Sequence, residues 1–113
     1  KVSAGFCDVP GVLIAGRVEA NGAKTYQFGK YRVPFTVGYP YGGLKQYRIV
    51  HNLGHTNYVP VATPVSVGNV WRKYHAHIVS IGPNDCFIAF IDSGTDGTLV
   101  TSAFTFALIG DNT

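Results

Sequence analysis

One pair of apolar segments limits the folds open to this chain more than any other feature: Val70–Ile81 and Cys86–Asp92. Both are rich in β-branched and aromatic residues, and the first alternates with a period of two, which is typical of β-strands. The link of residues 82–85, Gly-Pro-Asn-Asp, is turn-forming and predicts an antiparallel hairpin. The second segment is apolar on both faces, whereas a surface hairpin needs only one buried face. We therefore expect both faces of the hairpin to be covered.

The rest of the chain predicts further strands and no helix. Asn21-Gly22 is the strongest short hairpin signal, and Pro60 lacks the N–H that an interior strand would donate, so it predicts an edge position or a bulge. The segment Arg32–Gly43, with two prolines, fits a bent strand or a structured loop. The strands expected outside the hairpin are Val12–Ala20, Ala23–Tyr31, Leu44–His51, Asn57–Thr63 and Leu99–Ile109. Residues 1–113 should thus form one all-β domain, an antiparallel β-sandwich of about six to eight strands, with residues 1–11 as a lead-in from an upstream shaft or domain.

Composition indicates that partners cover part of the surface. Hydrophobic residues make up 46% of the chain and charged residues only 13%, against an average of about 25%. So few charges on a small domain favour apolar surface that is covered by another molecule. The net charge is +3, but only Arg72 and Lys73 are adjacent basic residues. We therefore expect neither nucleic-acid binding nor membrane insertion.

The double-faced hairpin predicts which side chains meet the core and which meet a neighbouring chain. The predicted core-facing residues are Tyr74, Ile78, Phe87 and Ile91 of the hairpin, with Phe104, Phe106 and Leu108 of the last strand. The predicted contacts with a neighbouring chain are Cys86, Ile88, Phe90 and Ile109. Burial there would contribute about 1.5–3 kcal/mol per large side chain. The alternative is that an N-terminal loop covers this face within one chain.

Catalytic signals are lacking in the sequence. There is no Gly-x-Ser-x-Gly elbow, no phosphate-binding glycine loop and no His-Glu-x-x-His helix. Only six acidic residues occur, and most lie in expected turns or in the tail. We therefore expect that the protein is not an enzyme and uses no catalytic cofactor.

The expected loops and strand ends carry aromatic and arginine side chains that suit ligand binding. Flat aromatic rings suit the apolar faces of sugars, and arginine supplies directed hydrogen bonds. The candidate ligand-binding residues are Trp71, Arg72, Tyr39, Tyr41, His51, His55 and Tyr58. The alternative is that several of these tyrosines are half-buried sandwich residues with only their hydroxyls in water.

From about Gly43 to Gly110 the order of motifs resembles the C-terminal receptor-binding tip of trimeric bacteriophage tail fibres. The resemblance lies in Asn57-Tyr58 leading to Ala62-Thr63-Pro64, in Cys86–Asp92, and in the closing Phe104-Thr-Phe106 run that ends at Gly110. The layout is also similar to the H-type lectin domain, a six-stranded sandwich that assembles as a trimer and binds sugars. Those lectins often carry a tryptophan near the end of the last strand, where this chain has Ala107 or Leu108. No sugar-contact residue is therefore transferred from them.

The resemblance implies a homotrimeric, extracellular virion component that attaches to a bacterial cell surface, with a saccharide as the expected receptor. A secreted H-type-like lectin and a purely structural trimerisation cap of a fibre are the alternatives.

His75 and His77 form a pair that fits two interpretations. Residues i and i+2 of a strand point to the same side, so the two imidazoles should lie side by side. Three symmetry copies could supply six nitrogens to a transition metal on the trimer axis, and some phage tail fibres hold metal with such pairs. Ordinary surface histidines are the alternative.

Overall fold

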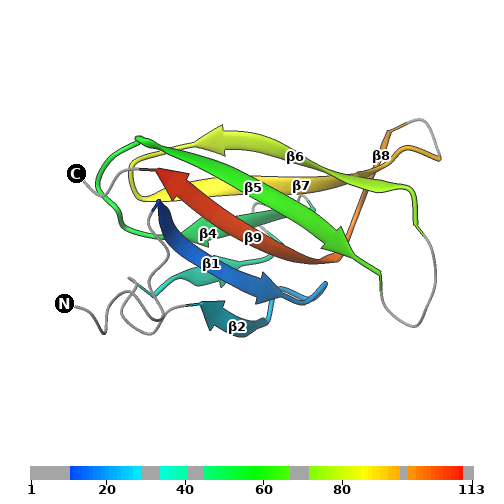
Figure 1. The fold of residues 1–113 in the computed structure, drawn as a ribbon. Coiled ribbons are helices and arrows are strands. Elements are labelled where there is room, and N and C mark those ends of the chain that lie inside the picture. The colour runs from blue at the N-terminus through cyan, green and yellow to red at the C-terminus, as the bar shows by residue number, and fades with distance from the viewer. Residues whose placement is uncertain (1–10, 29–33, 41–44, 67–71, 95–96, 111–113) are drawn as a thin grey trace.

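The computed structural model describes residues 11–28, 34–40, 45–66, 72–94 and 97–110 (Figure 1). These residues form nine strands in two antiparallel sheets and no helix, so the predicted all-β sandwich is confirmed. No described helix is therefore present that could cross a membrane. The first sheet has the order β2 (Lys24–Phe28), β1 (Val12–Val18), β9 (Ala103–Gly110), β5 (Tyr58–Val65). The second has the order β3 (Thr36–Gly38), β4 (Gln46–Val50), β7 (Asp85–Asp92), β6 (Tyr74–Ile81), and β8 (Thr98–Val100) also pairs with β7.

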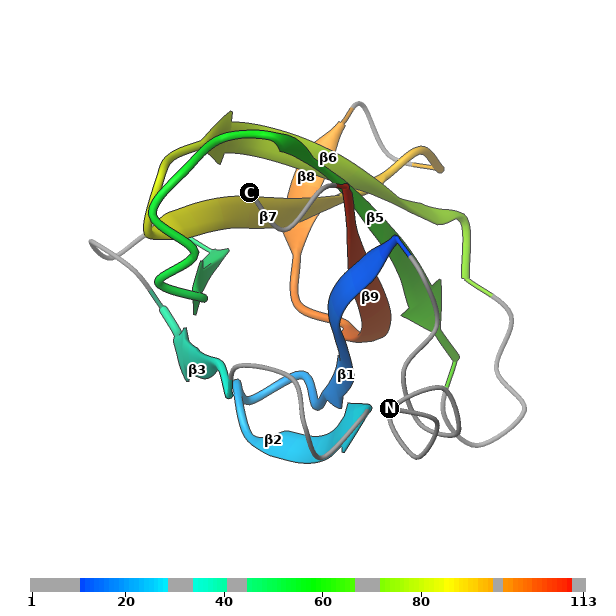
Figure 2. The same ribbon diagram turned by 60° about the vertical axis from the view of Figure 1, so that its left-hand side comes forward.

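Two short strands raise the number from the seven strands expected by residue range to nine. β3 lies inside the segment predicted as a bent strand or structured loop. The expected last strand is divided into β8 and β9, because Thr101 and Ser102 between them are not in a strand. The prediction for Pro60 is confirmed, since β5 is the edge strand of its sheet. Figure 2 shows the two sheets curving around a shared interior, with β5 beside β6 where the sheets meet.

Aromatic side chains from both sheets meet at the centre of this interior. Phe104 of β9 lies with its ring centroid 5.0 Å from that of Tyr47 on β4 and 4.9 Å from that of Phe90 on β7. Phe35 packs edge-on against Phe106 at 4.9 Å. All five rings are at most 4% exposed. The inward direction predicted for Phe104, Phe106 and Leu108 is thus confirmed.

The predicted faces of β7 are wrong. Cross-strand partners share a face, and Ile78 pairs with Ile88 while Ala76 pairs with Phe90. Ile78 packs on the core as predicted, but its partner Ile88 therefore faces inward, and Phe87 faces outward. Periodicity could not decide the direction because both faces of β7 are apolar. The register with β6, which shifts between Ile78 and Ser80, decides it.

This correction removes three of the four predicted contacts with a neighbouring chain. Cys86, Ile88 and Phe90 have no exposed surface, because they form the core of the single chain. Burial raises the pKa of the Cys86 thiol to about 12, so it is a neutral core residue. Only Ile109, which is 42% exposed, remains available to a neighbour.

Ile109 belongs to an apolar patch on the outer face of the first sheet. Val59, Ile109 and Val12 are directly paired across β5, β9 and β1, and Val61, Ala107 and Ala15 form the next row. Val59 is 62% exposed and Val61 48% exposed. We call these six residues the outer apolar patch. No charged side chain interrupts its two rows.

Candidate functional site

A concavity of about 430 Å³ lies at the end of the sandwich where β1 and β5 finish and β6 and β9 begin. This is the right-hand end in Figure 1. Its volume is within the roughly 300–1,000 Å³ typical of small-ligand sites. We call it the end pocket. The residues that line it are Ala20, Pro64, Val65, Ser66, Arg72, Tyr74, Thr101, Ser102 and Ala103.

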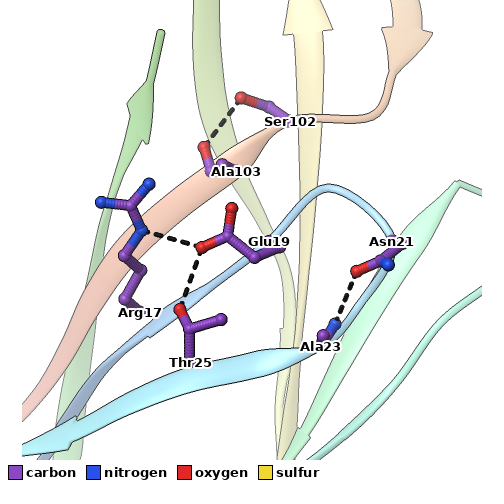
Figure 3. A network of polar contacts seen from close by, with 7 residues as sticks. All are labelled: Arg17, Glu19, Asn21, Ala23, Thr25, Ser102 and Ala103. Atoms are coloured by element: carbon purple, nitrogen blue, oxygen red, sulfur yellow. Dashed lines mark hydrogen bonds and ion pairs between the residues drawn. The ribbon is translucent and has the colours of Figure 1, made fainter. Parts of the chain in front are cut away.

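The β1–β2 turn places Ala20 in one wall of the pocket. Gly22 has a φ of 90°, a conformation that side chains with a Cβ rarely adopt, and its N–H donates to the carbonyl oxygen of Glu19 at 2.9 Å. The side chain of Asn21 accepts the N–H of Ala23, which closes the turn predicted from Asn21-Gly22 (Figure 3). The turn sequence therefore fixes the position of Ala20.

A polar network braces the base of the same turn, beside the start of β9 (Figure 3). The Glu19 carboxylate accepts hydrogen bonds from Thr25 Oγ1 and from Arg17 Nε, each at 2.9 Å. These two bonds lower the pKa of Glu19. The carboxylate thus remains charged and paired at neutral pH.

The buried hydroxyl of Tyr47 forms hydrogen bonds with two residues that line the pocket. It donates to the carbonyl oxygen of Ala20 at 2.7 Å and accepts the backbone N–H of Ser102 at 3.2 Å. Its ring stacks on Tyr39 with a centroid distance of 4.2 Å. Burial raises the pKa of Tyr47 to about 12, so the hydroxyl keeps its proton. Tyr47 is therefore a positioning residue for the pocket.

The lining carries the chemistry of a binding site. Ser66, Arg72 and Thr101 are exposed, whereas the hydroxyl of Ser102 is committed to the carbonyl oxygen of Ala103 at 2.8 Å. Tyr74, at the start of β6, is half-buried. Among the described residues that line the pocket, none carries a carboxylate, carboxamide, imidazole or thiol. The usual general bases and nucleophiles of hydrolases are thus missing from this lining, except for hydroxyls without a base beside them.

The structure does not bring together those predicted ligand-binding residues that it describes. Arg72 lines the end pocket, but His51 and Tyr58 lie at the opposite end of the sandwich, after β4 and at the start of β5. His51 is fully buried and Tyr58 is 5% exposed. The prediction that these two side chains contact a ligand is wrong, because both are buried inside the domain.

His51 and Tyr58 instead tie the β4–β5 loop to the β6–β7 turn. His51 Nδ1 accepts the N–H of Leu53 at 3.0 Å, so the neutral ring carries its proton on Nε2 and donates it to Tyr58 Oη at 2.9 Å. Tyr58 Oη in turn donates to the carbonyl oxygen of Gly82 at 2.8 Å. This arrangement requires a neutral imidazole.

We predict that this pair makes the stability of the domain depend on pH. Burial lowers the pKa of His51, so the unfolded chain binds a proton more readily than the folded one. The free energy of unfolding should therefore fall as the pH drops below about 6.5, and continue to fall until the folded-state pKa is passed. Urea unfolding at pH 7.5 and 5.5 measures the change. His51→Asn, which keeps an acceptor for the N–H of Leu53, should remove most of it, and an unchanged pH dependence in that variant would contradict this account.

The remaining predicted ligand residues are dispersed. Trp71 and Tyr41 lie outside the described residues. Tyr39 is half-buried and packs on Tyr47 behind the pocket. His55 lies in the β4–β5 loop, where its Nδ1 accepts the N–H of Asn57, and its buried Nε2 has no partner in the described part of the chain. Among the predicted ligand-binding residues that the structure describes, Arg72 is thus the one in the lining.

His75 and His77 are both exposed on β6, on the face shared with Ile91 and Ala89 of β7. Within the described ranges no group of three or more His, Cys, Asp or Glu side chains is close enough to hold a metal ion. A site that combines the pairs of three chains stays a prediction, and it requires a trimer packed on the second sheet rather than on the outer apolar patch.

Sequence reasoning missed most of the pocket. Ser66, Thr101 and Ser102 are small polar residues just outside strands, where turn residues are common and carry no distinguishing signal. Thr101-Ser102 did offer one clue, because this polar pair interrupts the apolar alternation between Leu99 and Ile109. For Tyr74 the sequence predicts a core position, whereas the structure places it half-buried in the pocket lining.

Comparison of the chain with protein-family models, with curated proteins and with solved structures finds no match.

Proposed function

We propose that this domain is the receptor-binding tip of a trimeric phage or phage-like tail fibre, and that it attaches to a saccharide on a bacterial cell surface. It acts by binding and not by catalysis, and its place is the virion, outside the cell. The observation that carries the proposal is the end pocket, in which Arg72 and exposed hydroxyls of Ser66 and Thr101 surround a space large enough for a sugar residue. The half-buried ring of Tyr74 supplies a flat surface for a sugar.

The direction of the strands supports a tip. β1 enters its sheet at Val12, which pairs with Ile109 near the end of β9. Both positions lie at the end of the sandwich opposite the pocket, because β1 runs toward the pocket and β9 runs away from it (Figure 1). A shaft that joined ahead of β1 at that end would leave the pocket facing outward.

The outer apolar patch supports assembly with further copies of this chain. Its two uncharged rows occupy the half of the sheet away from the pocket, so three copies could pack there and leave three pockets open. Exposed valine and isoleucine side chains without interspersed charges are typical of surfaces that another protein covers. Heterologous contacts between identical chains form a closed ring when their rotation closes, and a trimer is such a ring.

We predict that Val61→Lys changes the mass of the protein in solution. Val61 is 48% exposed, so the single chain tolerates a lysine there, but one charge from each copy would be buried in the assembly. Light scattering should give three times the 12.2 kDa chain mass for the wild type and the single-chain mass for the variant. Val79→Lys, at a 41% exposed site on the other sheet, is the matched control and should remain trimeric. A wild type with the mass of a single chain would contradict the proposed trimer.

Binding of the fluorescent domain to a panel of bacterial strains tests attachment itself. Saturable binding that unlabelled domain competes away, and that periodate oxidation of the cells abolishes, is the expected result. Saturable binding that survives periodate points to a receptor other than a saccharide. Absence of binding to every strain favours a structural trimerisation cap. A secreted H-type-like lectin would use the same pocket, and binding to animal glycans with none to bacteria would favour it.

A further inference from the structure

Arg72 is the one charged side chain among the described residues that line the end pocket. Sugar hydroxyls both donate and accept hydrogen bonds, so a neutral sugar is best held by side chains that include strong acceptors. The described lining has no carboxylate or carboxamide, and its side-chain acceptors are hydroxyl oxygens. Its strongest group is the Arg72 guanidinium, which only donates. The lining therefore matches a ligand that brings its own acceptors.

Arg72 has no anionic partner in the part of the chain that the structure describes. Two other arginines form ion pairs with described carboxylates. Arg17 Nε lies 2.9 Å from the Glu19 carboxylate, and Arg48 Nε lies 2.8 Å from the Asp85 carboxylate. Arg72 forms no such pair with a described carboxylate, although it is exposed at the rim of the pocket. A guanidinium fork of this kind binds a carboxylate or a phosphate through two parallel hydrogen bonds.

We infer that the end pocket takes an acidic saccharide, whose anionic group pairs with Arg72 while its hydroxyls meet Ser66 and Thr101. This inference rests on the proposed saccharide-binding function and narrows it to a ligand class. The formal net charge of +3 favours the approach of such a ligand. Because Arg72 is exposed, added salt weakens the pairing.

An array of bacterial surface polysaccharides, printed in three forms, tests the inference. The forms are the native polymers, the same polymers after reduction of carboxyl groups to alcohols, and the same polymers after phosphate removal with hydrofluoric acid. The probes are the full wild-type chain, Arg72→Gln, Arg72→Lys and Lys45→Gln. Lys45 is exposed and lies outside the pocket lining, so its variant removes the same charge elsewhere.

The wild type should bind native acidic polymers and lose binding after one of the two treatments, which identifies carboxylate or phosphate as the anion. Loss of one charge-assisted hydrogen-bonded pair corresponds to an affinity about 10- to 100-fold weaker for Arg72→Gln. Arg72→Lys, which keeps the charge without the fork, should fall between, and Lys45→Gln should match the wild type.

Two other outcomes separate this inference from the proposed function. Equal binding to native, carboxyl-reduced and dephosphorylated polymers, or full binding by Arg72→Gln, would overturn the acidic ligand while saccharide binding stands. Absence of binding to every polymer by the wild type would overturn both.

Discussion

Phe104→Ala should destabilise the domain by about 3–5 kcal/mol, the range for removal of a fully buried aromatic ring. Phe104 has no exposed surface and lies between the sheets, with Tyr47 and Phe90 of the opposite sheet within 5.0 Å of its ring centroid. The cavity is bordered by rings held in two separate sheets, so collapse around it is limited. Because small domains have about 5–15 kcal/mol of stability in total, this variant should be close to unfolding.

Urea unfolding followed by tryptophan or tyrosine fluorescence measures this loss. Tyr26→Ala is the control: Tyr26 is an aromatic residue that is 58% exposed on the outer side of the first sheet. Its removal should change the free energy of unfolding by no more than about 0.5 kcal/mol. Similar losses for the two variants would show that the interior described around Phe104 is not the core.

Tyr47→Phe should lower both stability and affinity for the ligand. The substitution keeps the ring and its stacking on Tyr39 but removes the hydroxyl that joins Ala20 to Ser102. The buried N–H of Ser102 then lacks its partner, which costs about 1–3 kcal/mol. Since Ala20 and Ser102 both line the pocket, ligand binding should weaken even when the variant is fully folded.

Tyr58→Phe is the matched control for that effect. Its hydroxyl is also buried and also joins distant backbone, but at the other end of the sandwich. We expect a comparable loss of unfolding free energy and unchanged ligand affinity. If both variants weakened binding equally, the Tyr47 hydroxyl would act only through overall stability.

How far the fold could be predicted depended on the contrast between strand faces. In β9, Phe104, Phe106 and Leu108 alternate with Thr105 and Ala107, so their direction followed from a period of two. In β7 every position from Cys86 to Ile91 is apolar, and alternation carried no information. There the direction depends on pairing with β6 and on a register shift at residues 78–80, which are tertiary features.

The candidate site could also be predicted only in part, because tertiary packing decides which side chains reach the pocket. Arg72 could be selected from sequence because it lies near the end of a predicted strand and its guanidinium supplies directed hydrogen bonds. His51 and Tyr58 looked equally suitable, but the fold buries both and uses their polar atoms to join two loops. Ser66 and Thr101 lie 35 residues apart and meet only because β5 ends beside the start of β9. Such proximity is not encoded in any local motif.

The central claim is that the ligand occupies the end pocket, and NMR mapping tests it most directly. Fragments of the surface polysaccharide from a strain that the domain binds would be titrated into the isotope-labelled protein. We predict that the largest amide shift changes fall on Ser66, Thr101 and Ser102, and that Arg72→Gln reduces them. Changes concentrated instead on residues 51–57 at the opposite end, or on the outer apolar patch, would contradict the account.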